Sequence, residues 1–301
     1  MACILIRSIA LLIAGCAAAA AQDLGTLRPK PLPPIEKPDN NTPAKELFGR
    51  KSTPMPMAAR VIGYYTNGCL AGAKALPING DTWQVMRLSR HRNWGHPNLI
   101  KFLERFAAKS AKLGWGHGLL VGDMAQPRGG PMITGHWSHQ VGLDADLWLT
   151  PMPDRILTPQ EREEMMATNV VADDWNDVNP EIWSPKHIAL LKTAAQDPEV
   201  ERVLVNPAIK KALCRDVTGD RSWLQKIRPV FGHNYHFHVR ISCPADSPDC
   251  KKQPAAPADE GCGKELDWWF SAEAKSIKPG VRKPVPLSSL PAACRQFAMQ
   301  P

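Results

Sequence analysis

The chain has 301 residues, of which 44% are hydrophobic and 22% are charged, and its formal net charge is +8. This composition is typical of a globular protein, and the length suffices for one large domain or two small ones. The excess of basic residues suits an anionic partner. Nucleic acid is not favoured as that partner, because the sequence contains neither a basic and aromatic motif nor a recognition helix.

Residues 1–21 have the layout of a secretory signal peptide. Arg7 precedes an apolar run from Ile9 to Ile13, and small residues continue to Ala21, after which we expect cleavage. The apolar run is too short to span a bilayer as a helix. An alternative stays open, because the sequence Leu-Ile-Ala-Gly-Cys ending at Cys16 resembles a lipoprotein box and would leave a lipidated N-terminus. Membrane association is expected only in that second case.

Either form of processing removes Cys3 and Cys16 from the count of free thiols and leaves six cysteines. An even number in an exported chain predicts three disulfides in an oxidising compartment, and the sequence leaves fifteen possible pairings. Zinc–thiolate chemistry is a weaker interpretation, because no Cys-x-x-Cys pair occurs. The remaining cysteines are Cys69, Cys214, Cys243, Cys250, Cys262 and Cys294.

Residues 22–57 are rich in Pro, Lys and Asn and lack apolar periodicity, which predicts an extended linker. Such a segment either carries a domain away from a membrane or is simply a disordered arm, and we favour the arm. The folded domain is expected to occupy residues 58–301, in which no internal repeat is evident.

Helices and strands alternate along this domain. The clearest helix covers residues 97–113, where Pro97 suits the first turn and Gly114 the stop, and a buried strand follows at 119–121. The later elements are a strand from Gly142, a helix opened by a capping box at Thr158, a helix from Ser184 to about Ala195, a strand at 202–205 and a strand through His236 and His238. No glycine-rich nucleotide fingerprint occurs, so we predict an α+β fold with a small antiparallel sheet flanked by helices.

The last fifty or so residues contain many prolines, Cys262 and Cys294, and the pair Trp268 and Trp269. We interpret this segment as a wrap that disulfides pin to the domain. The two tryptophans could line a substrate groove, but we expect them to be buried in packing.

Five of the nine histidines fall in two short windows, 135–148 and 232–239. Strand alternation from Gly142 places Asp144 and Asp146 on one face, and His236 and His238 also share a face. The candidate site residues in these windows are His136, His139, Asp144, Asp146, His233, His236 and His238.

These windows predict a zinc site. Two imidazoles and a carboxylate fill three positions of a tetrahedral zinc site and leave the fourth for water. Neighbouring strands would hold Asp146 and His238, and His139 would close the site from its loop. His236 would stand beside the metal, able to move protons. The alternative, satisfied polar groups on a wet sheet face, is less favoured for two clusters of this composition.

The pattern His-x6-Asp followed by His-x-His resembles the LAS group of zinc peptidases. Within that group, Gly-His-x-Ser-His-Gln-x-Gly-Leu-Asp-x-Asp at 135–146 is similar to the penicillin-insensitive murein endopeptidases, and the resemblance covers residues 62–294. Further motifs that carry it are Asn67-Gly-Cys69, Gly95-His-Pro97, Gly122-Asp-Met124, Val205-Asn-Pro-Ala-Ile-Lys210, Cys243-Pro-Ala-Asp-Ser247 and Gly261-Cys-Gly263.

The resemblance implies that His139, Asp146 and His238 hold one Zn²⁺ ion. It implies that His236 is the catalytic base or transition-state stabiliser, and that His233 orients His236 or contacts substrate. No His-Glu-x-x-His motif is present, so the glutamate base of that other class is missing.

The resemblance also includes a site for a second zinc ion, which would be held by His136 together with an Asp-x-x-His segment. The matching stretch here begins at Asp173 and has Asn176 where His is expected. Because Asn is a poorer zinc ligand than imidazole, a second zinc through His136 and Asp173 is not favoured. The resemblance further implies the disulfides Cys69–Cys294, Cys214–Cys262 and Cys243–Cys250.

The implied activity is that of a periplasmic metallo-endopeptidase, with peptidoglycan as the anionic partner. It would hydrolyse the amide between D-alanine and meso-diaminopimelate in cross-links. Zinc lowers the pKa of bound water from about 16 towards 7, so water serves as the nucleophile and there is no catalytic serine for a β-lactam to acylate. Two alternatives remain, a zinc D,D-carboxypeptidase that trims terminal D-alanine and a non-catalytic peptidoglycan-binding module. His236 argues against the second, because a closed structural site needs no spare proton carrier.

Overall fold

The computed structural model describes residue 32, residues 35–277 and residues 283–301. The expected signal peptide at 1–21, Cys16 and the first part of the expected linker lie outside the described residues. Within the described ranges, no helix is both long enough and apolar enough to cross a membrane.

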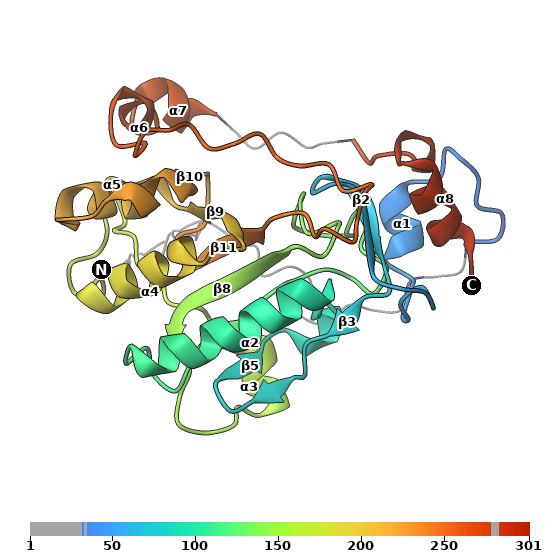
Figure 1. The fold of residues 1–301 in the computed structure, drawn as a ribbon, viewed down its shortest axis with the longest axis horizontal. Coiled ribbons are helices and arrows are strands. Elements are labelled where there is room, and N and C mark those ends of the chain that lie inside the picture. The colour runs from blue at the N-terminus through green and yellow to red at the C-terminus, as the bar shows by residue number, and fades with distance from the viewer. Residues whose placement is uncertain (1–31, 33–34, 278–282) are drawn as a thin grey trace, which may run out of the picture.

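A seven-stranded sheet forms the centre of the domain, with strand order β10-β9-β11-β8-β7-β5-β4 (Figure 1). The predicted α+β class is confirmed, and the central strands β9, β11, β8 and β7 pair antiparallel. Short outer strands enlarge the sheet through the parallel pairs β10–β9 and β5–β7. The strands are β4 (Asn79–Gly80), β5 (Trp83–Val85), β7 (Leu119–Val121), β8 (Asp144–Pro151), β9 (Val200–Val205), β10 (Ile227–Pro229) and β11 (His236–Ile241).

The helix predicted at 97–113 is α2 (Pro97–Lys112). Its N-cap residue is His96, whose Nδ1 accepts a hydrogen bond from the Asn98 amide at 3.2 Å. Pro97 occupies the first helical position, where its missing N–H costs nothing. Gly114 follows the helix with φ of +75°, a conformation that ends helices and that glycine adopts without strain.

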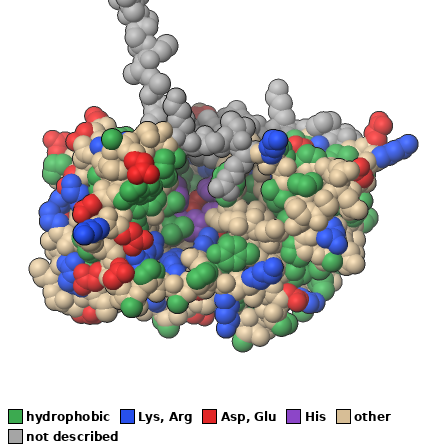
Figure 2. Space-filling model, turned by 90° about the horizontal axis from the view of Figure 1, so that it is seen from above, with side chains coloured by type: hydrophobic (Ala, Val, Ile, Leu, Met, Phe, Trp, Pro, Cys, Tyr) green, Lys and Arg blue, Asp and Glu red, His purple; other side chains and the backbone are tan. Residues whose placement is uncertain are grey.

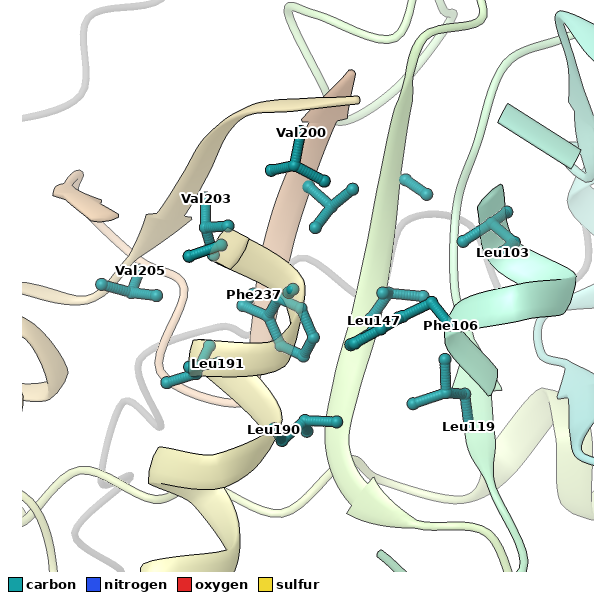
Figure 3. Packing of buried hydrophobic residues seen from close by; sticks show 14 of the residues in the cluster. Leu103, Phe106, Leu119, Leu147, Leu190, Leu191, Val200, Val203, Val205 and Phe237 are labelled. Atoms are coloured by element: carbon teal, nitrogen blue, oxygen red, sulfur yellow. The ribbon is translucent and has the colours of Figure 1, made fainter. Parts of the chain in front are cut away.

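The main core lies between the sheet and the helices α2 and α4 (Pro185–Gln196). Leu103 and Phe106 point from α2 toward the sheet, and Leu190 does so from α4 (Figure 3). They join Leu147 of β8 and Phe237 of β11 in one buried cluster. The rings of Phe106 and Phe237 meet edge to face with centroids 6.3 Å apart. Since side chains alternate along a strand, the other face of β8 and β11 carries Asp146 and His238.

The remaining helices are shorter. Thr158 opens α3 with the predicted capping box, in which its hydroxyl accepts from the Glu161 amide and the Glu161 carboxylate accepts from the Thr158 amide. Two further two-stranded sheets lie beside the central one. The additional elements are α1 (Ala44–Phe48), α3 (Pro159–Glu164), α5 (Pro207–Asp216), α6 (Lys264–Trp268), α7 (Ala272–Ser276), α8 (Ala292–Met299), β1 (Arg60–Tyr64), β2 (Asn67–Ala71), β3 (Lys74–Ala75) and β6 (Trp94–Gly95).

A second, smaller core joins the two ends of the described chain. The helices α1 and α8 lie side by side against the β1–β2 hairpin (Figure 1). Ala44 and Phe48 of α1 are fully buried there. The segment 22–57 is therefore not an extended linker throughout, since it folds from α1 onward. Three apolar residues in one short turn of helix are too few to produce a periodic pattern in the sequence.

All three disulfides have the expected pairing, Cys69–Cys294, Cys214–Cys262 and Cys243–Cys250. The expectation that Trp268 and Trp269 are buried is wrong, because Trp268 is 36% exposed and Trp269 is only partly buried. Both lie at the end of α6, a five-residue helix in which Leu266 is the buried residue. This helix lies apart from the main core (Figure 1) and offers the tryptophans little to pack against.

Replacing the Cys69–Cys294 disulfide by Cys69→Ser and Cys294→Ser should lower the free energy of unfolding by about 5 kcal/mol. The cross-link spans a sequence separation of 225 residues, so it strongly restricts the unfolded chain. The matched pair Cys243→Ser and Cys250→Ser should cost only about 2.5 kcal/mol, since that separation is 7 residues. Urea denaturation followed by circular dichroism measures both, and equal losses would contradict the expected dependence on loop length.

Candidate metal centre

The register between β8 and β11 brings the two predicted strand ligands together. His238 pairs directly with Asp146, and His236 pairs with Trp148. As a result, His238 Nδ1 lies 3.2 Å from Asp146 Oδ1. Figure 2 shows histidine side chains gathered in a hollow of the surface.

His139 reaches the same carboxylate from the loop before β8. Its Nε2 lies 3.4 Å from Asp146 Oδ1, and its backbone has a left-handed φ of +67°. The His139 amide donates to Asp144 Oδ2 at 3.1 Å, which stabilises this backbone. The loop is also attached to β2, because the Gly68 amide donates to Gln140 Oε1 at 3.2 Å.

Gly142 is required between this loop and β8. Its φ is +67°, and a Cβ atom there would lie 2.3 Å from Leu70 Cδ2. A larger residue would push the loop away from β2 and shift His139.

His136 contacts the other oxygen of the same aspartate. Its Nδ1 lies 3.3 Å from Asp146 Oδ2, while its Nε2 lies 2.9 Å from Asp123 Oδ2. Burial alone would lower the pKa of His136, but the carboxylates of Asp146 and Asp123 raise it. His136, His139 and Asp146 form a group of potential metal ligands whose donor atoms lie within 4.8 Å of one another, whereas the predicted ligand His238 is not part of this group although its Nδ1 contacts Asp146 Oδ1.

The buried atoms at the centre lack hydrogen bonds. Among the described residues, neither His139 Nε2 nor Asp146 Oδ1 has a hydrogen-bond partner of acceptable geometry. Burial alone would raise the pKa of Asp146, but His236 and His139 hold it well below its usual range, so the carboxylate is charged. Because buried polar atoms without partners are costly, an ionised carboxylate facing imidazole nitrogens is a suitable site for a cation.

Asp144 supports the ligands from behind. It is fully buried and accepts hydrogen bonds from Arg240 Nε at 2.9 Å and Arg240 Nη2 at 3.0 Å. Its Oδ2 also lies 3.2 Å from His238 Nε2, an ion-pair contact without hydrogen-bond geometry. This contact leaves the Nδ1 side of the His238 ring facing Asp146. Carboxylates that hold the second nitrogen of a metal-ligating histidine in this way fix its orientation and increase its basicity.

Asp123 lies behind His136 as Asp144 lies behind His238. Its Oδ2 accepts hydrogen bonds from Arg90 Nη1 at 2.9 Å and Arg92 Nη1 at 2.8 Å. Burial alone would raise the pKa of Asp123, but Arg92 and His136 hold it well below its usual range. Asp123 is thus a permanent negative charge on which His136 is oriented.

In the metal-free protein, protons compete with a metal ion for the ligand nitrogen atoms. Burial alone would lower the pKa of His238, but Asp144 and Asp146 raise it to about 9. A cation at this position therefore displaces a proton, as is usual for histidine ligands.

His236 and His233 lie beside the group. His236 Nε2 is 3.7 Å from Asp146 Oδ2, and burial lowers the pKa of His236 to about 4, although Asp146 opposes this. His236 is therefore neutral at pH 7. The His233 ring lies 4.7 Å from that of His236, and its Nδ1 lies 3.0 Å from the carbonyl oxygen of Phe231. Burial also lowers the pKa of His233 well below its usual range.

Asp173 does not join this arrangement. It is exposed and lies outside the group of potential ligands found among the described residues. Asn176, which stands where a histidine would complete a second site, donates through Nδ2 to Asp174 at 3.0 Å and accepts through Oδ1 from Lys275 at 2.7 Å. His136 instead contacts the aspartate that faces the other imidazoles.

The sequence pattern predicts strands through Asp146 and through His236 and His238, as the structure has them, but it assigns no role to Asp123 or to the Asp144–Arg240 pair. For Asp144 the signal was present, because it shares a strand face with Asp146. Asp123 follows the buried strand β7, which is a weaker hint. Its contacts with Arg90 and Arg92 depend on the turn after β5, which no local pattern predicts.

Comparison with known proteins places this chain. A family model described as penicillin-insensitive murein endopeptidase matches residues 61–299. Proteins of that name are similar to it in Haemophilus influenzae (46% identical over 247 residues, 81% of this chain and 84% of the relative) and in Yersinia enterocolitica (45% over 242 residues, 80% and 86%). Another, from Shigella sonnei, is 45% identical over 231 residues, 77% of this chain and 82% of the relative. Together with the grouping of His136, His139 and Asp146, these matches show that the chain belongs to the penicillin-insensitive murein endopeptidase family.

Proposed function

We propose that this protein is a zinc endopeptidase that hydrolyses the amide between D-alanine and meso-diaminopimelate in murein cross-links. The observation that carries the proposal is the convergence of His139 Nε2 and His238 Nδ1 on Asp146 Oδ1, at 3.4 and 3.2 Å. The family membership and the names of the relatives favour an endopeptidase over a carboxypeptidase or a binding module.

His139, Asp146 and His238 would hold the zinc ion. Two imidazoles and one carboxylate are a frequent ligand set of catalytic zinc and leave a position open. When bound, zinc supplies a Lewis acid that polarises the scissile carbonyl group and makes water nucleophilic at neutral pH. His136, oriented by Asp123, lies on the other oxygen of Asp146, and we propose that it completes the charge balance around that carboxylate.

His236 would handle the proton. It is neutral at pH 7, buried, and 3.7 Å from Asp146, so it stands next to the reacting atoms without being needed as a ligand. His236 accepts a proton from the attacking water at Nε2 and later donates it to the amine nitrogen of the leaving diaminopimelate. His233 positions His236 through the contact of their tilted rings, whose centroids lie 4.7 Å apart.

An enzyme that acts on murein works outside the cytoplasm. The apolar and small-residue pattern at 1–21 supports export through a signal peptide and a periplasmic location. The three disulfides agree with an oxidising compartment.

Removal of zinc by EDTA should abolish cleavage of cross-linked muropeptide dimers. The variants His139→Ala and His238→Ala should do the same, because the metal loses a ligand. Liquid chromatography with mass spectrometry of the digested dimers measures this. Zinc should restore the chelated wild type, and a β-lactam should have no effect, because no serine is acylated. The exposed histidine variant His117→Ala is the control and should cleave normally. Full activity in a metal-free sample would refute the proposal.

His236→Ala should retain one zinc ion per chain but lose roughly 10²–10⁴-fold in kcat, the usual contribution of a positioned acid–base group. Elemental analysis measures the zinc and dimer hydrolysis measures kcat. A variant that keeps both its zinc and a rate close to wild type would show that another group transfers the proton.

Asp144→Asn should weaken zinc binding about 10–100-fold, because Asp144 lies behind His238 and fixes its ring. Competition with a chelating dye at pH 7 measures the affinity, and a thermal melt checks that the variant is folded. Asp173→Asn is the matched control, since this exposed aspartate lies outside the ligand group, and it should bind zinc as the wild type does. Equal affinity in both variants would exclude the supporting role of Asp144.

A further inference from the structure

A pocket of about 310 Å³ lies on the His233 side of the metal centre. Four segments build it, namely the turn at 174–175, Asn206 and Pro207 at the start of α5, the loop at 231–232, and residues between 269 and 277, which follow α6 and include part of α7. The side chains used in the argument are Asp174, Trp175, Phe231, Trp269, Phe270 and Lys275. Its volume is at the lower end of ligand pockets, roughly 300–1,000 Å³, and four aromatic side chains contribute to its lining.

The aromatic rings are open to solvent although they lie close together. Trp175 is 38% exposed and Phe231 is 46% exposed. The rings of Phe231 and Trp269 meet with centroids 4.7 Å apart. Large aromatic side chains that gather on a surface without being buried mark a binding site, because each of them gains free energy when a ligand covers it.

The pocket shares a loop with the proton-handling histidines. Phe231 precedes His233 by two residues, and the centroid of the His233 ring lies 4.7 Å from that of His236. Asn206 fixes this loop on both sides, since its Nδ2 donates to the Gly232 carbonyl at 2.7 Å and its amide donates to the His233 carbonyl at 3.2 Å. A ligand in the pocket therefore lies next to a substrate at the metal centre.

Trp175 is held outward in an unfavourable conformation. Its φ is +60°, which is rare for a bulky side chain. Neighbouring groups compensate for this, because the Trp175 amide donates to the Ala172 carbonyl at 2.9 Å and the Asn176 amide donates to Asp174 Oδ1 at 2.9 Å. Strain that the surrounding contacts maintain in this way is concentrated at functional sites.

The charges around the pocket favour a neutral polar ligand. Both nearby lysines are directed to Asn176, with Lys211 Nζ 2.9 Å from its carbonyl oxygen and Lys275 Nζ 2.7 Å from its Oδ1. Lys211 also lies over the Phe270 ring at 5.1 Å. The remaining charged side chain is the exposed carboxylate of Asp174, which accepts hydrogen bonds from hydroxyl groups. A ligand with apolar C–H faces and hydroxyl groups fits this combination, and that is the chemistry of a sugar ring.

We propose that this pocket binds the N-acetylhexosamine units of a glycan strand, so that the enzyme grips the sugar backbone of murein beside the peptide that it cleaves. The inference rests on the proposed function, because murein consists of glycan strands joined by peptides. Trp175 and Trp269 stack on the sugar faces, and Asp174 accepts hydrogen bonds from the sugar hydroxyls. An acidic stem peptide is the competing ligand, because the Lys275 ammonium group lines the pocket and, among the described residues, donates only to the neutral amide of Asn176; the aromatic side chains, which a carboxylate does not need, favour the sugar.

The test compares two substrates that differ only in their sugars. One is a cross-linked muropeptide dimer that carries its disaccharides, and the other is the same cross-linked peptide after the disaccharides have been removed. Trp175→Ala and Trp269→Ala should each lower kcat/KM for the sugar-bearing dimer about fivefold to tenfold and leave the sugar-free dimer unchanged. Trp175→Phe, which keeps a ring, should be intermediate, and Ile156→Ala, an exposed apolar residue outside the pocket, should behave as wild type. Equal losses on both dimers would overturn the proposal in favour of a peptide ligand.

A titration of the chelated, metal-free protein with N-acetylglucosamine oligomers separates the pocket from the chemistry. Tryptophan fluorescence of the wild type should change saturably, and Trp175→Ala should bind about fivefold to tenfold more weakly. No saturable change in the wild type, or equal binding by the variant, would overturn the proposal. If the enzyme cleaves neither dimer, the proposed function fails while this titration still decides whether the pocket binds sugar.

Discussion

The centre of this protein depends on one carboxylate, that of Asp146. One of its oxygens faces His139 and His238, and the other faces His136 and His236. A buried negative charge among four imidazoles is stable only if positive charge is supplied, by protons or by a cation. The carboxylates raise the pKa values of His136 and His238, so both imidazoles hold a proton more tightly than an ordinary histidine does.

The pairing of two neighbouring strands positions the groups around Asp146. The β8–β11 register places His238 opposite Asp146, and strand alternation puts Leu147 and Phe237 on the reverse face, where α2 and α4 cover them. The rigid hydrophobic core and the metal centre are thus two faces of the same two strands. Because a shift of one residue would turn every side chain to the opposite face, core packing fixes the geometry of the ligands.

Short-range patterns carried most of the sequence-based predictions. The alternation after Gly142 was enough to place Asp144 and Asp146 on one strand face, and the single residue between His236 and His238 placed both histidines on one face. The capping box at Thr158 defined a helix start. The pairing of the cysteines and the assignment of the ligands required a resemblance to known proteins. Those predictions concern features that a few neighbouring residues encode, or that homologous chains share.

Features that depend on distant contacts were missed. The five residues of α1 are helical because α8 and the β1–β2 hairpin bury Ala44 and Phe48, and nothing within 22–57 indicates this. Trp268 and Trp269 look like core residues in the sequence, but α6 lies away from the main core. Arg90 and Arg92 meet Asp123 only in the folded chain, so neither spacing nor composition reveals their contact.

The Cys69–Cys294 bond has a consequence beyond closing the domain. Cys69 lies in β2 between Gly68, which is hydrogen-bonded to the loop of His139, and Leu70, which packs close to Gly142. The disulfide therefore anchors β2, the strand that contacts the loop of His139. Thiol oxidation thus stiffens the scaffold of an ion-binding loop, and the redox state of the compartment is linked mechanically to the positioning of His139.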